Sequence, residues 1–153
     1  MRIVVLTSSY PRFAGDIAGI FVAEHVEMLR LAGHQVDVLT WARPGSAQAS
    51  SLHATDVRYA PDGMQTLFYG AGAPENLTSW GNVLLAPQAM AAMLRAGLKA
   101  ARGADLVIGH WLVPAGLIAR QIGEHLKIPS LVVGHSGGVH VLGRLPLSVG
   151  RRL

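Results

Sequence analysis

Three turns in this chain carry residues that could bind a ligand or do acid–base chemistry, and each follows a short apolar run. The first turn contains Ser8 and Tyr10, the second contains His110, and the third is His135, Ser136, Gly137 and Gly138. Imidazoles and hydroxyls exchange hydrogen bonds with polar substrates, and glycines let a ligand approach the backbone. Since ligands collect at the carboxyl ends of parallel strands, the pattern predicts a binding site there.

The first turn continues through Gly15, Asp16 and Gly19 into an expected helix. The two glycines leave the backbone uncovered. Asp16 is expected to cap the helix, and the free amides at its start would face an incoming anion. A role of the glycines in turn geometry and close helix packing alone fits the sequence equally well.

The histidines differ in what their positions predict. His135 lies in a glycine-rich turn where packing does not account for it, so we expect a functional imidazole there and take it as the candidate catalytic residue. His110 fits either a functional or a hydrogen-bonded structural role beside Trp111. His25 is expected in the core, and His140 is expected to be structural or peripheral. No motif spacing supports a zinc site made of His110, His135 and His140, and we expect no metal.

Several enzyme classes are disfavoured by the residues near the predicted strand ends. A glycosidase needs two opposed carboxylates, and Asp16 is the acid found there. A dinucleotide site would show Gly-x-Gly-x-x-Gly and then an acid after the second strand, where this chain has Gly15-x-x-x-Gly19 and Thr40-Trp41.

The elements that must position these residues alternate between strands and helices. We expect strands at 2–6, 36–39, 57–59, 67–69, 105–108 and 130–133, and helices at 17–32, 87–101 and 114–126, with Gly33 and Gly103 ending the first two helices. Phe21, His25, Met28, Leu29 and Ala32 form the expected buried face of the first helix. This order predicts an α/β, Rossmann-like, doubly wound and mostly parallel sheet with strand 2–6 in its centre.

Length and composition are those of one globular domain spanning 1–153. Hydrophobic residues make up 50% and charged residues 14%, and the formal net charge is +4. No basic run is interleaved with aromatics, so we expect no nucleic-acid partner. The absence of cysteine excludes disulfides and thiolate chemistry. Without a signal peptide or an apolar run of about 20 residues, we expect a cytoplasmic protein.

Basic side chains recur at helical spacing in one segment and cluster near the end of the sequence. They are Arg95, Lys99 and Arg102, and Arg144, Arg151 and Arg152. We expect a modest peripheral contact with the inner membrane face or another anionic surface. A solvated helix face is the commoner meaning of such a stripe.

The motifs together resemble the amino-terminal half of family-four retaining glycosyltransferases. The resemblance rests on Leu6–Arg12 with Gly15-Asp16 and Gly19-Ile20-Phe21, on Gly109–Gly116, and on Val133–His140. It implies one half of a GT-B enzyme, in which two Rossmann-like domains face a cleft. In such enzymes the amino-terminal half mainly binds the acceptor, the other half holds the nucleotide sugar, and no metal is required.

By this resemblance, Gly15 and Gly19 would approach the acceptor or the donor diphosphate, and His135 would hydrogen-bond the transferred sugar or its phosphate. The family often has an acid where this chain has Gly138, and the donor domain with its paired glutamates is not found in this sequence. We therefore expect a glycan or lipid-linked acceptor as ligand, and transfer of sugar only together with a donor-domain polypeptide. Two alternatives stay open: a non-catalytic sugar- or phosphate-binding module, and an unrelated enzyme using His110 and His135 as acid and base.

Overall fold

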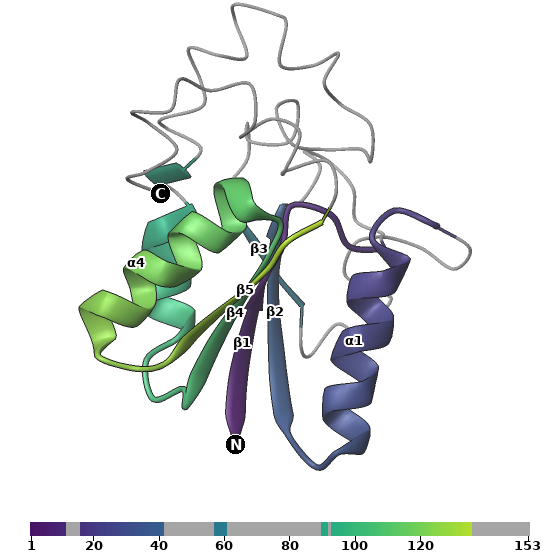
Figure 1. The fold of residues 1–153 in the computed structure, drawn as a ribbon, viewed down its shortest axis with the longest axis horizontal. Helices are drawn as coiled ribbons and strands as arrows, with labels where there is room; N and C mark the ends of the chain where they lie inside the picture. The colour runs from purple at the N-terminus through teal and green to yellow at the C-terminus, as the bar shows by residue number, and fades with distance from the viewer. Residues whose placement is uncertain (12–15, 42–56, 61–89, 92, 136–153) are drawn as a thin grey trace, which may run out of the picture.

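The computed structural model describes residues 1–11, 16–41, 57–60, 90–91 and 93–135 (Figure 1). Within them, five strands form one sheet in which every neighbouring pair is parallel. The order is β3-β2-β1-β4-β5, with β1 at Arg2–Leu6, β2 at Gln35–Trp41, β3 at Val57–Ala60, β4 at Leu106–His110 and β5 at Ser130–Val133. The chain leaves β1 first toward β2 and later toward β4, so β1 is central. This confirms the predicted doubly wound α/β fold; the expected strand at 67–69 lies outside the described residues.

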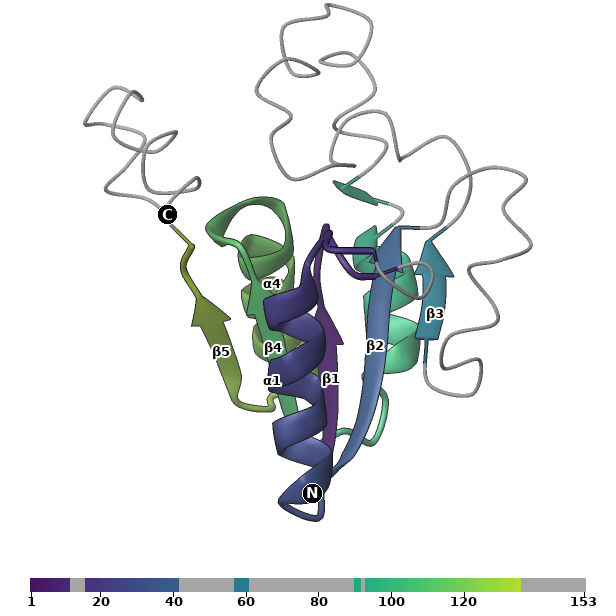
Figure 2. The same ribbon diagram turned by 90° about the vertical axis from the view of Figure 1, so that its right-hand side faces the viewer.

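Helices cover both faces of the sheet (Figures 1 and 2). Helix α1 (Ile20–Leu31) packs on one face, and α4 (Leu117–Leu126) and a helix over 93–100 pack on the other. Alternate residues of β1 pack against the helices on the two sides of the sheet, because side chains along a strand point to opposite faces. Ile3 and Val5 join the cluster under α1, and Val4 and Leu6 join the cluster under the other helices.

The amino end of α1 and its buried face differ from the sequence prediction. The helix begins at Ile20, three residues later than expected, and its buried residues are Val22 and Val26. Phe21 is 38% exposed and Met28 is 63% exposed, so the expected row is not the core-facing one. Two neighbouring rows of this helix are apolar, and the β-branched pair Val22 and Val26 is the one that packs with Ile3 and Val5. Gly33 and Gly103 do follow their helices with positive φ, as predicted.

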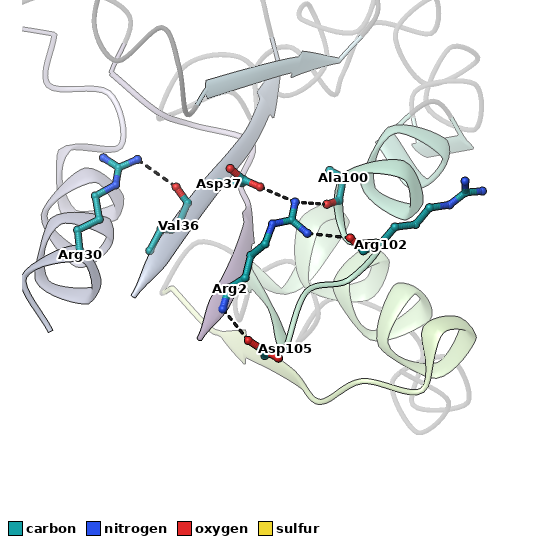
Figure 3. Close-up of polar contacts among 7 residues, drawn as sticks. All are labelled: Arg2, Arg30, Val36, Asp37, Ala100, Arg102 and Asp105. Atoms are coloured by element: carbon teal, nitrogen blue, oxygen red, sulfur yellow. Dashed lines mark hydrogen bonds and ion pairs between the residues drawn. The ribbon is translucent and has the colours of Figure 1, made fainter. Parts of the chain in front are cut away.

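Arg2 joins β1, β2 and the end of the 93–100 helix at the amino edge of the sheet (Figure 3). Its guanidinium forms an ion pair with the buried carboxylate of Asp37 at 2.7 Å. It also donates to the carbonyl oxygens of Ala100 at 2.9 Å and Arg102 at 2.8 Å. The last carbonyls of a helix have no partner within the helix, so Arg2 satisfies two groups that would otherwise need water. Its own backbone N–H donates to Asp105.

Replacing Arg2 with alanine is expected to lower the free energy of unfolding by about 2 kcal/mol, because the change removes charge-assisted hydrogen bonds and a counter-charge from buried Asp37. Arg120→Ala is the matched control. It breaks an exposed pair with Glu124 one turn along α4 and should cost less than about 0.5 kcal/mol. Urea unfolding of both variants measures the difference, and equal losses would contradict a structural role for Arg2.

Candidate functional site at the carboxyl edge of the sheet

The three predicted turns lie at one edge of the sheet. Leu6 of β1 pairs with Gly109 of β4, and His110 pairs with Val133 of β5, so these strands end side by side. The backbone N–H of Trp111 donates to the carbonyl oxygen of Val133 at 3.0 Å, which extends the pairing beyond β4. The strand order reverses between β1 and β4. Open α/β sheets bind ligands at the carboxyl ends of the strands at such a position.

Three histidines from three elements form a continuous chain at this edge. His25 Nδ1, on α1, lies 3.0 Å from His110 Nε2, at the end of β4. His110 Nδ1 in turn lies 3.1 Å from Nε2 of His135, which follows β5. His110 is the middle ring, and it is only 2% exposed. Both of its ring nitrogens therefore face another imidazole, while His135 forms the outer end of the chain.

Aromatic side chains surround the outer histidine. The ring centre of His135 lies 4.6 Å from that of Phe21 and 4.8 Å from that of Trp111. Phe21 and Trp111 contact each other edge to face at 5.8 Å. His135 also stacks on His110, with ring planes 14° apart. An imidazole held among aromatic rings presents a polar group within an apolar frame, which is the usual make-up of a small-molecule site.

His25 belongs to this cluster, although its position on the apolar helix face predicts an ordinary core histidine. Its Nδ1 is within hydrogen-bond distance of His110. The difference follows from the rotation of α1: with Val22 and Val26 facing the core, Phe21 and His25 turn toward the carboxyl ends of β4 and β5. Their spacing of one helical turn was the signal available in the sequence.

The backbone beside the histidines is held in an unusual conformation. Trp111 has φ 74° and ψ 135°, a region that non-glycine residues rarely adopt. The following segment, η3 (Leu112–Gly116), packs so closely that a Cβ on Gly109 would lie 2.6 Å from the carbonyl oxygen of Ala115. A Cβ on Gly116 would lie 2.7 Å from the carbonyl oxygen of Trp111. Both glycines permit the tight return of the chain that turns the Trp111 ring onto His135.

The turn after β1 is organised by backbone contacts. The Thr7 hydroxyl donates to the Ser9 carbonyl oxygen at 2.8 Å, and Thr7 is fully buried. Gly19, with φ 69°, lies against that same carbonyl, where a Cβ would overlap it. This contact holds the start of α1 against the end of β1. Ser8 follows Thr7 at this edge, and Tyr10 is buried in the cluster under α1.

Asp16 does not cap α1, contrary to the sequence prediction. Its carboxylate accepts from the backbone N–H of Ala18 at 3.0 Å, in the turn before the helix, and Gly19 occupies the cap position without a side-chain bond. The late start of the helix, fixed by the contact of Gly19 with Ser9, places Asp16 out of reach. The amides of Ile20, Val22 and Ala23 already donate to backbone carbonyls, which leaves fewer amides for an anion than expected.

Four predicted site residues, namely Gly15, Ser136, Gly137 and Gly138, lie outside the described residues, as does His140. Their roles stay predictions. Of the basic residues, Arg95, Lys99 and Arg102 are exposed, and Arg144, Arg151 and Arg152 lie outside the described part of the chain. Contact with an anionic surface also stays a prediction. Within the described residues, no helix is long and apolar enough to cross a membrane.

Burial and the neighbouring imidazoles keep His110 and His135 neutral. Burial, followed by the proximity of His25 and His135, lowers the pKa of His110 from its ordinary 6.5 to about 4. Burial and then His25 also lower the pKa of His135. At neutral pH both rings are uncharged, so they act as hydrogen-bonding groups and not as a cationic site.

The lowered pKa of His110 predicts acid sensitivity. The unfolded chain binds a proton near pH 6.5 and the folded chain only near pH 4, so the stability is complete above pH 6.5 and falls as the pH drops between these values. The contribution of this residue alone should make the free energy of unfolding about 2 kcal/mol lower at pH 5 than at pH 7.5. Urea unfolding at both pH values measures the loss. His110→Gln should reduce it and the exposed control His125→Gln should not; equal pH dependence in both variants would contradict the assignment.

The cluster is not arranged as a metal site. His110 directs one nitrogen toward His25 and the other toward His135, and a single ion cannot bind both nitrogens of one ring. Over the described residues, no group of three or more histidine or acidic side chains is placed to hold an ion. The three imidazoles contact each other directly instead.

Comparisons with known proteins find likenesses among solved structures. No protein-family model matches the chain, and no curated protein matches it. Among solved structures, the chain is similar to MurG of Acinetobacter baumannii, with 19% sequence identity and a TM-score of 0.48. The match covers 86% of this chain and 34% of that one, so the chain spans about a third of the length of that protein.

Proposed function

We propose that this chain is the acceptor-binding half of a GT-B glycosyltransferase of the family-four type, and that His135 contacts the sugar. The observation that carries the proposal is the position of His135: a neutral imidazole among Phe21 and Trp111, at the edge where the strand order reverses. The three motifs that resemble the family include each of these residues.

The chemistry of the cluster suits a sugar better than a phosphate. A sugar ring has apolar C–H faces that pack on aromatic side chains, and hydroxyls that exchange hydrogen bonds with a neutral imidazole. A phosphate is bound most strongly by cations, and the pKa values of both His110 and His135 are lowered. We therefore favour a sugar hydroxyl over a phosphate as the partner of His135.

Two buried polar groups at this edge support a ligand site. Within the described part of the chain, the indole N–H of Trp111 and the hydroxyl of Ser9 have no hydrogen-bond partner. A buried donor without a partner is costly, and a ligand oxygen is one group that would satisfy it. Trp111 also contacts His135, so a single ligand could reach both side chains.

Transfer requires a second half that grips the nucleotide sugar and closes the cleft, on the same polypeptide or on a separate one. In this proposal the chain supplies the acceptor wall of the cleft, and the donor half supplies the groups that stabilise the leaving diphosphate. The acceptor is a glycan or a lipid-linked sugar, and the resemblance implies no metal. Both nitrogens of His110 face other histidines, so we assign it no direct role as acid or base.

Equilibrium binding tests the proposal. Calorimetric titration with methyl glucoside, methyl mannoside, UDP-glucose and inorganic diphosphate should show weak binding of a glycoside and no tighter binding of diphosphate. His135→Ala should weaken glycoside binding about tenfold, the effect of losing one hydrogen bond and a ring contact. The exposed control His125→Ala should leave it unchanged. Preferential binding of diphosphate, or equal affinities in the two variants, would overturn the proposed role of His135.

A further inference from the structure

The two contacts of His110 impose a direction on the histidine chain. Each N–H···N bond needs one donor and one acceptor, and a neutral imidazole has one of each. His110 must therefore donate to one neighbour and accept from the other. When all three rings are neutral, only two arrangements satisfy both bonds. Either all three rings carry the proton on Nε2, or all three carry it on Nδ1.

The intrinsic chemistry of histidine favours the first arrangement. The nearby backbone withdraws electrons from Nδ1 and makes it less basic, so a neutral histidine in water keeps its proton mainly on Nε2. In this arrangement His135 Nε2–H donates to His110 Nδ1, and His110 Nε2–H donates to His25 Nδ1. All three rings then have their preferred tautomer, and both bonds are made.

We propose that His25 is a positioning residue of the site: by accepting the N–H of His110, it fixes the tautomer of His135 through the buried ring between them. His135 then keeps an unprotonated Nδ1, which accepts a hydrogen bond. The role in ligand binding rests on the proposed function, because a sugar hydroxyl is the donor that this nitrogen would meet. The direction of the chain itself does not depend on any ligand.

Removal of the His25 acceptor reverses the preference. In a His25→Leu variant, a proton on His110 Nε2 would be buried without an acceptor, which is costly. His110 escapes this by carrying its proton on Nδ1 and donating to His135 Nε2. His135 must then carry its proton on Nδ1 and becomes a donor at the position where it was an acceptor. A change on α1 thus alters the chemistry of a residue after β5.

Heteronuclear NMR of isotope-labelled histidine tests the proposal on the chain without ligand, near pH 8. Protonated and unprotonated ring nitrogens resonate at well-separated shifts, so each tautomer is read directly. In the wild-type chain Nδ1 of His135 should have the shift of an unprotonated nitrogen. It should move toward the protonated value in His25→Leu and return in His25→Asn, whose side-chain oxygen can replace Nδ1 as acceptor. The exposed control His125→Leu should match the wild type.

Two results would overturn the proposal: an unchanged His135 tautomer in His25→Leu, or a protonated Nδ1 in the wild type. If His25→Leu fails to fold, scalar couplings across the His25–His110 and His110–His135 hydrogen bonds are measured in the wild-type chain. The proposal requires both couplings, and the absence of either would contradict it. Glycoside titration of the same samples is a separate readout. If the tautomer moves as expected and no glycoside binds, the proposed function fails and the histidine chain stands; with binding, affinity should drop about tenfold in His25→Leu and recover in His25→Asn.

Discussion

A Gly19→Ala variant is expected to lose about 3 kcal/mol of unfolding free energy. At φ 69° an L-residue is strained by about 1 kcal/mol, and the added Cβ would overlap the Ser9 carbonyl, so the ends of β1 and α1 must separate. The neighbouring Thr7–Ser9 hydrogen bond is part of that junction. Urea unfolding measures the loss of stability. The ring contacts of Phe21, which lies near the start of α1, should weaken in the same variant.

The Gly33→Ala variant measures the cost of backbone strain without the steric overlap that Gly19→Ala also introduces. Gly33 also has positive φ, at 84°, but a Cβ there would meet nothing within 4 Å. Its replacement should therefore cost only the strain, about 1 kcal/mol. If the two variants lose the same stability, the close approach of Gly19 to Ser9 does not matter for the fold.

A His135→Ala variant is expected to lose about a hundredfold in kcat/KM for sugar transfer when the chain is assayed with a donor-binding half. The expected loss combines the proposed hydrogen bond to the sugar with the ring contacts that His135 makes with Phe21 and Trp111. Product formation from a labelled nucleotide sugar measures it.

The controls for this assay are His125→Ala and Trp111→Phe. His125 is exposed on α4 and should have no effect. Trp111→Phe keeps an aromatic ring near His135 but removes the indole N–H, so it should reduce transfer less than His135→Ala does. Activity in His135→Ala equal to that of the His125 control would remove His135 from the mechanism.

Much of the fold could be predicted because its signals are local. Short apolar runs that end in polar turns correspond to β1, β4 and β5, and Gly33 and Gly103 follow their helices as expected. The central position of β1 is the one expected if the strands follow the common doubly wound order, and the structure has that position. These rules need no knowledge of which side chains touch.

The errors concern features that depend on contacts distant in the sequence. The start of α1 is fixed by the contact of Gly19 with Ser9, and this made the cap assignment of Asp16 wrong. The rotation of α1 is fixed by Val22 and Val26, since two neighbouring rows of the helix are apolar.

The position of the candidate site could be predicted from the order of the strands, but its side-chain contacts could not. The convergence of His110 and His135 follows from the strand order, which the sequence pattern indicates. The participation of His25 and Phe21 depends on how α1 is turned about its axis, and no local pattern records that. The buried position of His110 between two imidazoles is likewise visible only in three dimensions.

The central claim is that this chain forms one wall of a glycosyltransferase cleft and cannot transfer sugar by itself. The most direct measurement is a transfer assay with the purified chain at high concentration, labelled UDP-glucose or GDP-mannose, and methyl glucoside or methyl mannoside as the acceptor. We expect glycoside binding that depends on His135 and no transfer product until a donor-binding half is added. Turnover by the purified chain alone would contradict the proposed division of labour.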